Sequence, residues 1–212
     1  MTQLFTLPKT MLRMALSVAA LLLVFTATST FAAEPVVLTD SIDSYPLGLH
    51  FEYYEDTTGS LTLQDVLSPE VSRQFKQNKK IVANFGKTRS AYWFRFTVMN
   101  RMSSAQELLL ASSWPLYDHI DLFIQNRSGV YEHREHGNVF PFHHREIDNR
   151  NFVFRISPPR NEPQVVYIRI QTETSMQAPF IIYDPDKFTT INNIENLIDD
   201  YWIELIWESA GK

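Results

Sequence analysis

Apolar and polar residues alternate with a two-residue period in four stretches of the chain. In residues 91–99 the even-numbered side chains from Tyr92 to Val98 are apolar, and the odd-numbered ones include Arg95 and Thr97. Successive side chains of a strand point to opposite faces, so this pattern predicts a strand with one face in the core. The same pattern predicts strands over 119–124, 151–156 and 165–171.

Shorter apolar runs and turn-forming clusters extend this β pattern. Further strands are predicted over 36–39, 49–54, 107–111 and 179–183. Clusters rich in Gly, Pro, Asn, Asp and Ser separate the runs, at 100–104, 126–129, 157–161 and 184–186. Since no helix alternates with these strands, we expect an all-β fold, an antiparallel β-sandwich or jelly roll.

Two segments have a helical pattern instead. Residues 61–77 contain Ser68-Pro69-Glu70, which is typical of a helix start with proline in the first turn, and we expect one or two short helices there. From Phe188 to Leu205 apolar residues recur at helical spacing, which predicts an amphipathic helix over about 188–208. Its other positions include acids, so docking on the domain or on a partner is favoured over binding to an anionic lipid surface.

Residues 1–32 have the three parts of a secretory signal peptide. Lys9 and Arg13 precede an apolar stretch from Met14 to Phe25, and small residues follow up to Ala32. This stretch is shorter than the about 18 residues that a membrane span needs, so an uncleaved anchor ranks second. We expect export to the periplasm of a Gram-negative bacterium, one sandwich domain over 33–188 and a helical tail over 189–212.

Composition narrows the classes of function. The chain has no cysteine, which excludes disulfides and cysteine-ligated zinc. Of its 19 Lys and Arg residues two lie in 1–32, and the remaining 17 stand against 24 Asp and Glu, a formal charge of −7. Proteins that bind nucleic acid usually carry a clustered basic face, so we expect no nucleic-acid partner.

The candidate site lies on the face of the predicted strands that points away from the core. If the strands share one sheet, this face gathers aromatic rings and charged groups: Trp93, Arg95, Asp121, Phe123, Arg155, Tyr167 and Arg169. Aromatic rings stack on flat ligands such as sugars, and arginine offers a fixed fork of donors. The ligand-binding hypothesis rests on Trp93, Arg95, Asp121, Tyr167 and Arg169. In the alternative, the arginine stems cover the rings and pair with Asp121 on a solvated or partly buried face.

Motifs for catalysis or metal binding are absent from the sequence. It contains no Gly-x-Ser-x-Gly elbow, no phosphate-binding glycine loop and no Gly-x-Gly-x-x-Gly fingerprint, so we expect no enzyme activity and no cofactor. Five of the six histidines lie between His119 and His144, but His133-Arg134-Glu135-His136 lacks the spacing of a zinc hydrolase. We expect structural or exposed histidines and no metal, and a pH-sensing role stays open.

Five motifs occur in an order that resembles one receptor family. They are 91–97 (AYWFRFT), 114–122 (WPLYDHIDL), 141–142 (PF), 150–154 (RNFVF) and 171–176 (QTETSM). Over residues 35–188 the chain resembles the type-two extracellular domain of bacterial seven-transmembrane receptors with diverse intracellular signalling modules (7TM-DISM). The resemblance implies a jelly-roll β-sandwich similar to carbohydrate-binding modules, displayed in the periplasm, that binds carbohydrate-like or other small ligands.

The resemblance also implies seven membrane helices after the domain, and here the chain departs from it. The residues after Phe188 include Asp199, Asp200 and Glu204 and stop at Lys212, so no span is expected there. The chain is expected to be a truncated or a free-standing receptor domain. The leading hypothesis is a non-catalytic sensor of a carbohydrate-like or other small molecule. The alternatives are a scaffold that docks a membrane receptor or periplasmic protein and, least favoured, a carbohydrate-active enzyme.

Overall fold

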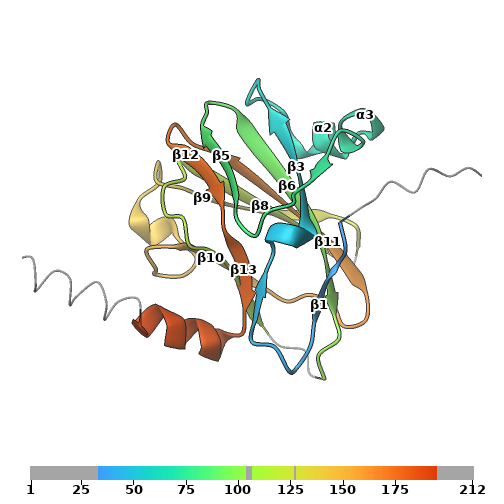
Figure 1. Cartoon of the computed structure of the whole chain (residues 1–212), viewed down its shortest axis with the longest axis vertical. Helices are drawn as coiled ribbons and strands as arrows, with labels where there is room; N and C mark the ends of the chain where they lie inside the picture. Colours follow the sequence, from blue (N-terminus) through green and yellow to red (C-terminus); the bar gives the residue numbers. More distant parts are fainter. Residues whose placement is uncertain (1–32, 104–106, 127, 195–212) are drawn as a thin grey trace, which may run out of the picture. The chain divides into compact units, whose positions relative to one another are not determined.

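Antiparallel strand pairing builds most of the structure. The computed structural model describes residues 33–103, 107–126 and 128–194 (Figure 1). Its largest sheet has seven strands, in the order β4-β3-β6-β11-β8-β9, with β1 paired in parallel to β6. These strands are β1 (Val36–Leu38), β3 (Phe51–Asp56), β4 (Lys76–Gln77), β6 (Ala91–Asn100), β8 (His119–Gln125), β9 (Tyr131–His136) and β11 (Pro163–Gln171).

A second sheet has four strands in the order β10-β7-β13-β2. They are β2 (Ser44–Pro46), β7 (Leu108–Ser112), β10 (Phe152–Ile156) and β13 (Phe180–Tyr183). A third sheet pairs β5 (Ala83–Lys87) with β12 (Ser175–Ala178). Two short 3-10 helices, η1 (Gly48–His50) and η2 (Phe142–His144), complete the connections between strands.

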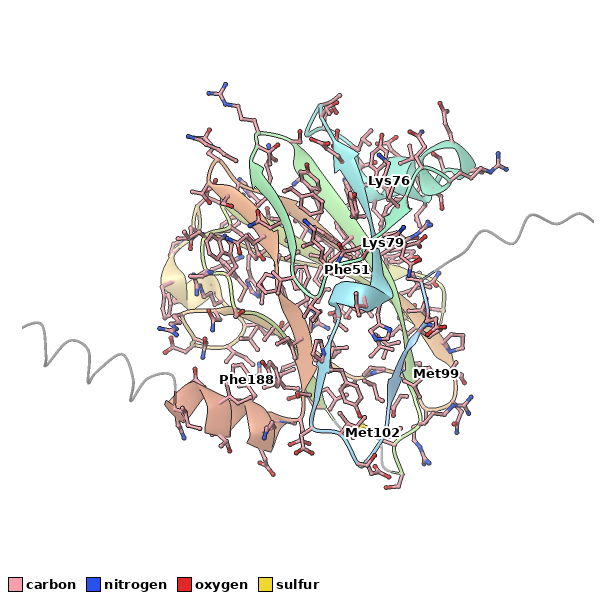
Figure 2. All side chains as sticks on the ribbon, viewed as in Figure 1. Phe51, Lys76, Lys79, Met99, Met102 and Phe188 are labelled. Atoms are coloured by element: carbon pink, nitrogen blue, oxygen red, sulfur yellow. The ribbon has the colours of Figure 1, made fainter. Side chains whose placement is uncertain are left out.

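The main hydrophobic core lies between the seven-stranded and four-stranded sheets. It takes alternate residues from the strands, as their patterns predict, and Phe94 of β6 meets Phe180 of β13 with ring centroids 5.8 Å apart. Phe51 of β3, labelled in Figure 2, is fully buried in the same cluster. The predicted all-β antiparallel sandwich is confirmed, and the finer jelly-roll strand order stays a prediction.

Two short helices fill the connection between β3 and β4 beside the seven-stranded sheet (Figure 1). In α2 (Leu63–Leu67) the Thr62 hydroxyl accepts from the Asp65 amide, and the Asp65 carboxylate accepts from Thr62 in return. In α3 (Pro69–Ser72) Ser68 caps the N-terminus and Pro69 occupies the first turn. These caps satisfy backbone donors that have no partner inside the helix, which is why the sequence starts helices at these two points.

Residues 185–194 form a helix against the outer face of the four-stranded sheet. Phe188, labelled in Figure 2, packs with Leu109, Ala111 and Val153, and the Asn149 amide donates to Asn192 at 2.6 Å. The predicted amphipathic helix is therefore observed over its first part. Its remainder and the predicted signal peptide, residues 1–32, lie outside the described residues.

Candidate functional site

Strand register brings the predicted site residues together on the outer face of the seven-stranded sheet. Trp93 of β6 lies opposite Arg169 of β11, which lies opposite Asp121 of β8. One row further along, Arg95 lies opposite Tyr167. The five residues of the ligand-binding hypothesis thus share one face. Arg155, which the sequence pattern grouped with them, lies on β10 in the other sheet.

The segment that holds α2 and α3 covers this face. Trp93 is 0% exposed and Tyr167 is buried, and both pack in a second hydrophobic cluster with Val66 of α2 and Phe75. Leu63, Leu67 and Val71 of the covering segment pack against the same cluster. The face is therefore a second, smaller core. The Trp93 Nε1 donor is buried and has no hydrogen-bond partner among the described residues.

Arg95 ties the covering segment to the sheet. Its Nε donates to the Glu52 carboxylate at 2.7 Å, and its Nη1 donates to the Ser72 hydroxyl of α3 at 2.7 Å. Its guanidinium also lies 4.2 Å from the centre of the Phe75 ring. The Arg95 and Glu52 side chains are both largely shielded from solvent, so each charge needs the opposite charge of the other to offset its loss of hydration.

Arg169 and Asp121 form the other charged pair of the covered face. Arg169 Nη1 donates to Asp121 at 3.3 Å, and its Nη2 donates to the Gly59 carbonyl and the Gln171 side chain. The other Asp121 oxygen lies 2.8 Å from His133 Nε2. Four of the five predicted residues thus contact the covering segment: Trp93, Arg95, Tyr167 and Arg169. Asp121 is joined to this group through Arg169. That a ligand binds to them stays a prediction.

An open cleft lies between the edge strands of the two main sheets. It has a volume of about 1000 Å³ and separates β9, the edge of the seven-stranded sheet, from β10, the edge of the four-stranded sheet. Most of the residues that line it are polar or charged: Glu107, Gln125, Asn126, Glu132, Arg134, Glu135, His136, His144, Glu146, Arg155, Ser157, Glu162 and Gln164, with Ile124, Gly129, Pro159 and Pro163. Sequence reasoning missed this site because its residues come from five separate segments with no shared motif.

Arginine and glutamate side chains bridge the two walls of the cleft. Arg134 of β9 donates to the Arg155 carbonyl of β10 and pairs with Glu132 at 2.7 Å and Glu146 at 3.3 Å. Arg155 pairs with Glu107 at 3.3 Å and Glu146 at 3.8 Å. Glu146 therefore contacts arginines from both sheets. A ligand in this cleft would touch groups on both sheets at once.

His136 lines the cleft from β9 and is only 6% exposed. Its Nε2 accepts a hydrogen bond from the Glu146 amide at 3.3 Å, so in the neutral ring the proton lies on Nδ1. Nδ1 is buried and has no partner among the described residues. Burial is the main cause that lowers the pKa of His136, and the neighbouring His144 and Arg145 lower it further.

Of the other histidines, His144 lies beside His136, with ring centroids 5.8 Å apart. His119 lies 3.7 Å from Glu135, and His133 contacts Asp121. Among the described residues no group of three or more His, Asp and Glu side chains is placed to hold a metal ion. Within the same part of the chain, no helix is long and apolar enough to cross a membrane.

Comparison with known proteins gives the family. The model of the family described as 7TMR-DISM extracellular 2 matches residues 48–184, which is more than half of the 212 residues. No curated protein matches the chain. The matched region runs from η1 to the end of β13 and so includes the covered face and the cleft. The chain therefore belongs to the 7TMR-DISM extracellular 2 family, whose members are extracellular sensor domains of signalling receptors.

Proposed function

We propose that this domain senses a small polar molecule in the periplasm of a Gram-negative bacterium by binding it, without chemical change, in the cleft between β9 and β10. The observation that carries the proposal is the cleft itself. Its volume falls at the upper end of the range for small-ligand sites, about 300–1000 Å³. Membership in a family of sensor domains supports a signalling role.

The lining of the cleft suits a ligand with many hydrogen-bonding groups. Gln125, Asn126 and Gln164 offer amide donors and acceptors, and the glutamates add charged acceptors. A carbohydrate-like molecule has a matching density of hydroxyl groups, and we propose this class first.

Binding there would affect how the two sheets are held together. Arg134 and Glu146 already connect the edges, and a ligand that contacts both walls would strengthen or replace these connections. A ligand can shift a conformational equilibrium only through such a difference in contacts between the two states. The cleft therefore offers a means of converting binding into a signal.

A thermal-shift screen with matched variants tests the site. Sugars, amino acids, nucleosides and organic acids are added to the protein, since a ligand at 100 times its Kd stabilises by about 2.7 kcal/mol. Ser157→Trp places a bulky ring at the wall of the cleft and is expected to abolish any shift. Ser41→Trp, on an exposed residue elsewhere, is the control and is expected to keep it. A shift that survives Ser157→Trp would contradict the cleft assignment.

The covered face is the second candidate, favoured by the unpaired Trp93 Nε1. A ligand would reach Trp93, Arg95, Asp121, Tyr167 and Arg169 only if the segment with α2 and α3 moved away. In that case the shift persists in Ser157→Trp and is lost in Arg169→Gln, which removes a charge of the covered face. Loss in Ser157→Trp with retention in Arg169→Gln assigns the ligand to the cleft.

A further inference from the structure

Positive charge is concentrated in one segment of this acidic protein. Between Val71 and Ser90 the chain carries six Lys or Arg residues and no Asp or Glu, although the whole chain has a formal charge of −5. Lys76, Lys79 and Lys80 lie in the middle of the segment, and all three are exposed. None of them forms an ion pair with a described residue. The surface there presents uncompensated positive charge.

Large aliphatic side chains are exposed next to these lysines. Ile81 is 70% exposed and Val82 is 42% exposed, directly after Lys79 and Lys80 in the chain. Leu49, in η1, is 50% exposed. A single exposed aliphatic residue is ordinary, but several together beside a group of lysines indicate an interaction surface.

Buried hydrogen bonds fix these residues in one place. The side-chain amide of Asn78 donates to the carbonyls of Gly48 and Lys80, both at 2.6 Å. The backbone N–H of Asn78 donates to the Phe51 carbonyl at 3.1 Å. Gly48 approaches so closely that a Cβ atom there would lie 1.8 Å from the Ile81 carbonyl oxygen. The loop of residues 78–82 is therefore held against η1 at Gly48, the residue directly before Leu49. Lys76 and Lys79 are labelled in Figure 2.

Lysines beside exposed aliphatic side chains fit an anionic membrane better than a soluble polyanion. Anionic lipid headgroups attract lysine side chains, each worth about 1 kcal/mol near the surface, and aliphatic side chains gain further by entering the boundary of the acyl chains. A soluble polyanion such as a nucleic acid would compensate the lysines and leave Ile81, Val82 and Leu49 exposed. The aliphatic residues therefore favour a membrane over a soluble polyanion.

We propose that Lys76, Lys79, Lys80, Leu49, Ile81 and Val82 form a membrane-docking surface that binds anionic lipid headgroups. This surface lies on η1, β4 and the loop that follows β4, and it shares no residue with the cleft. Docking would hold one side of the domain against the bilayer and leave the cleft to the ligand. The inference is independent of which ligand the cleft binds.

Co-sedimentation with lipid vesicles tests the proposal. Residues 33–212 are used because they form a compact unit with its own core, and because the apolar stretch of residues 14–25 would bind lipid by itself. Vesicles of phosphatidylcholine with phosphatidylglycerol are expected to sediment the protein, and those of phosphatidylcholine alone are not. Binding is expected to fall as salt rises, because salt screens exposed charges.

Matched variants distinguish lipid binding through this surface from nonspecific binding of the whole protein to vesicles. The double variant Lys79→Gln with Lys80→Gln should weaken binding about 25-fold, the product of about fivefold for each lysine. Ile81→Ser should weaken it as well, since it removes the inserted side chain. Lys187→Gln and Val139→Ser alter an exposed lysine and an exposed valine elsewhere and should leave binding unchanged.

Three results would overturn the inference. Absence of binding to the phosphatidylglycerol vesicles would exclude an anionic membrane as the partner. Binding that survives the double lysine variant would place the contact elsewhere on the protein. Binding that depends on the lysines, ignores Ile81→Ser and is competed fully by dextran sulfate would identify a soluble polyanion as the partner instead.

Discussion

His136 is a buried histidine with one unpaired nitrogen at a cleft that carries several charged groups. Its pKa lies below the ordinary value because burial disfavours the charged ring, an effect that Glu146 opposes and that His144 and Arg145 reinforce. The histidine cluster of the sequence thus contains one member whose protonation is linked to folding. The sequence-based expectation of structural histidines fits His136, and a pH-sensing role stays a prediction.

Lowering the pH should destabilise the protein through His136. Its pKa is lower in the folded than in the unfolded state, so the unfolded chain binds more protons between the two values. This contribution to stability is complete above the unfolded pKa of about 6.5 and is lost as the pH falls towards the folded value. Urea unfolding at a series of pH values should show a shallower acid loss in His136→Phe.

His143→Gln is the control for this experiment, because His143 is exposed. Its stability should follow the same pH dependence as the unmodified protein. If His136→Phe loses stability with falling pH as steeply as the unmodified protein does, other groups govern the acid response.

Tyr117 is fully buried, and its hydroxyl holds two parts of the chain together. The hydroxyl donates to the Gln177 carbonyl at 2.7 Å and lies 2.7 Å from the Ser112 hydroxyl. Burial raises the pKa of Tyr117 well above its ordinary value. Tyr117→Phe should lower the free energy of unfolding by about 1–3 kcal/mol, because it leaves a buried carbonyl without its donor.

Tyr54→Phe is the matched control for that loss. The Tyr54 ring stacks on the Phe75 ring, with ring centroids 5.8 Å apart. The Tyr54 hydroxyl makes no hydrogen bond with a described residue. Chemical denaturation should show little change for this variant. An equal loss in the two variants would mean that the Tyr117 hydrogen bonds contribute no net stability.

At the scale of elements, the covering segment depends on buried charge as well as on apolar packing. Arg95 reaches α3, and Arg169 reaches the Gly59 carbonyl before α2, so both arginines of the covered face hold the segment to the sheet. The aromatic and arginine pattern that suggested a ligand groove also suits this structural role. Rings and arginines pack in the same way against a helix as against a bound molecule.

Arg169→Met should lower the free energy of unfolding by about 2–4 kcal/mol, because Asp121 then stays buried with only His133 as a partner. Urea unfolding measures the loss. Arg101→Met removes an exposed arginine whose side chain bonds, among the described residues, only to Asn161, and it should change the stability little. Equal stability of the two variants would show that the Arg169 pair is unimportant to the fold.

At the scale of the whole molecule, a few side chains join the two sheet edges across the cleft. Arg134 connects β9 with β10 directly and shares Glu146 with Arg155. Edge strands have unpaired backbone groups and open more readily than central ones. Hydrogen bonds and ion pairs therefore keep the β9 and β10 edges from separating, whereas apolar packing in the main core holds the central strands of the two sheets together.

Arg134→Met should loosen the edges at the cleft. Amide hydrogen exchange in β9 is expected to speed up relative to the unmodified protein, because the bonds to Arg155 and Glu146 are lost. Exchange in β6, which lies between two paired strands, should stay the same. Faster exchange throughout the sheet would indicate general destabilisation instead of a local effect at the cleft.

The alternation of apolar and polar residues along the chain was enough to predict the β-sandwich and the residues of its core. Strict alternation in 91–99, 119–124, 151–156 and 165–171 fixes which side chains face inward, because a strand has a period of two whatever its partner is. The sequence also placed a helix start at Ser68, since a cap is a local interaction, whereas the start at Thr62 was not predicted. Polar and short strands such as β9 and β4 lack this alternation, so their pattern gave no clear signal.

Which surfaces are covered and which are open depends on how the elements pack, and the sequence pattern did not predict it. Alternation shows that Trp93 and Arg95 face away from the main core, but whether α2 and α3 fold back over them depends on contacts between distant residues. The cleft likewise forms because β9 and β10, separated in sequence, end up as facing edges of two sheets. Periodicity is a property of residues that are neighbours in the sequence. A cleft or a covered face instead depends on how whole elements pack, and the contacts that stabilise this packing join residues that lie far apart in the sequence.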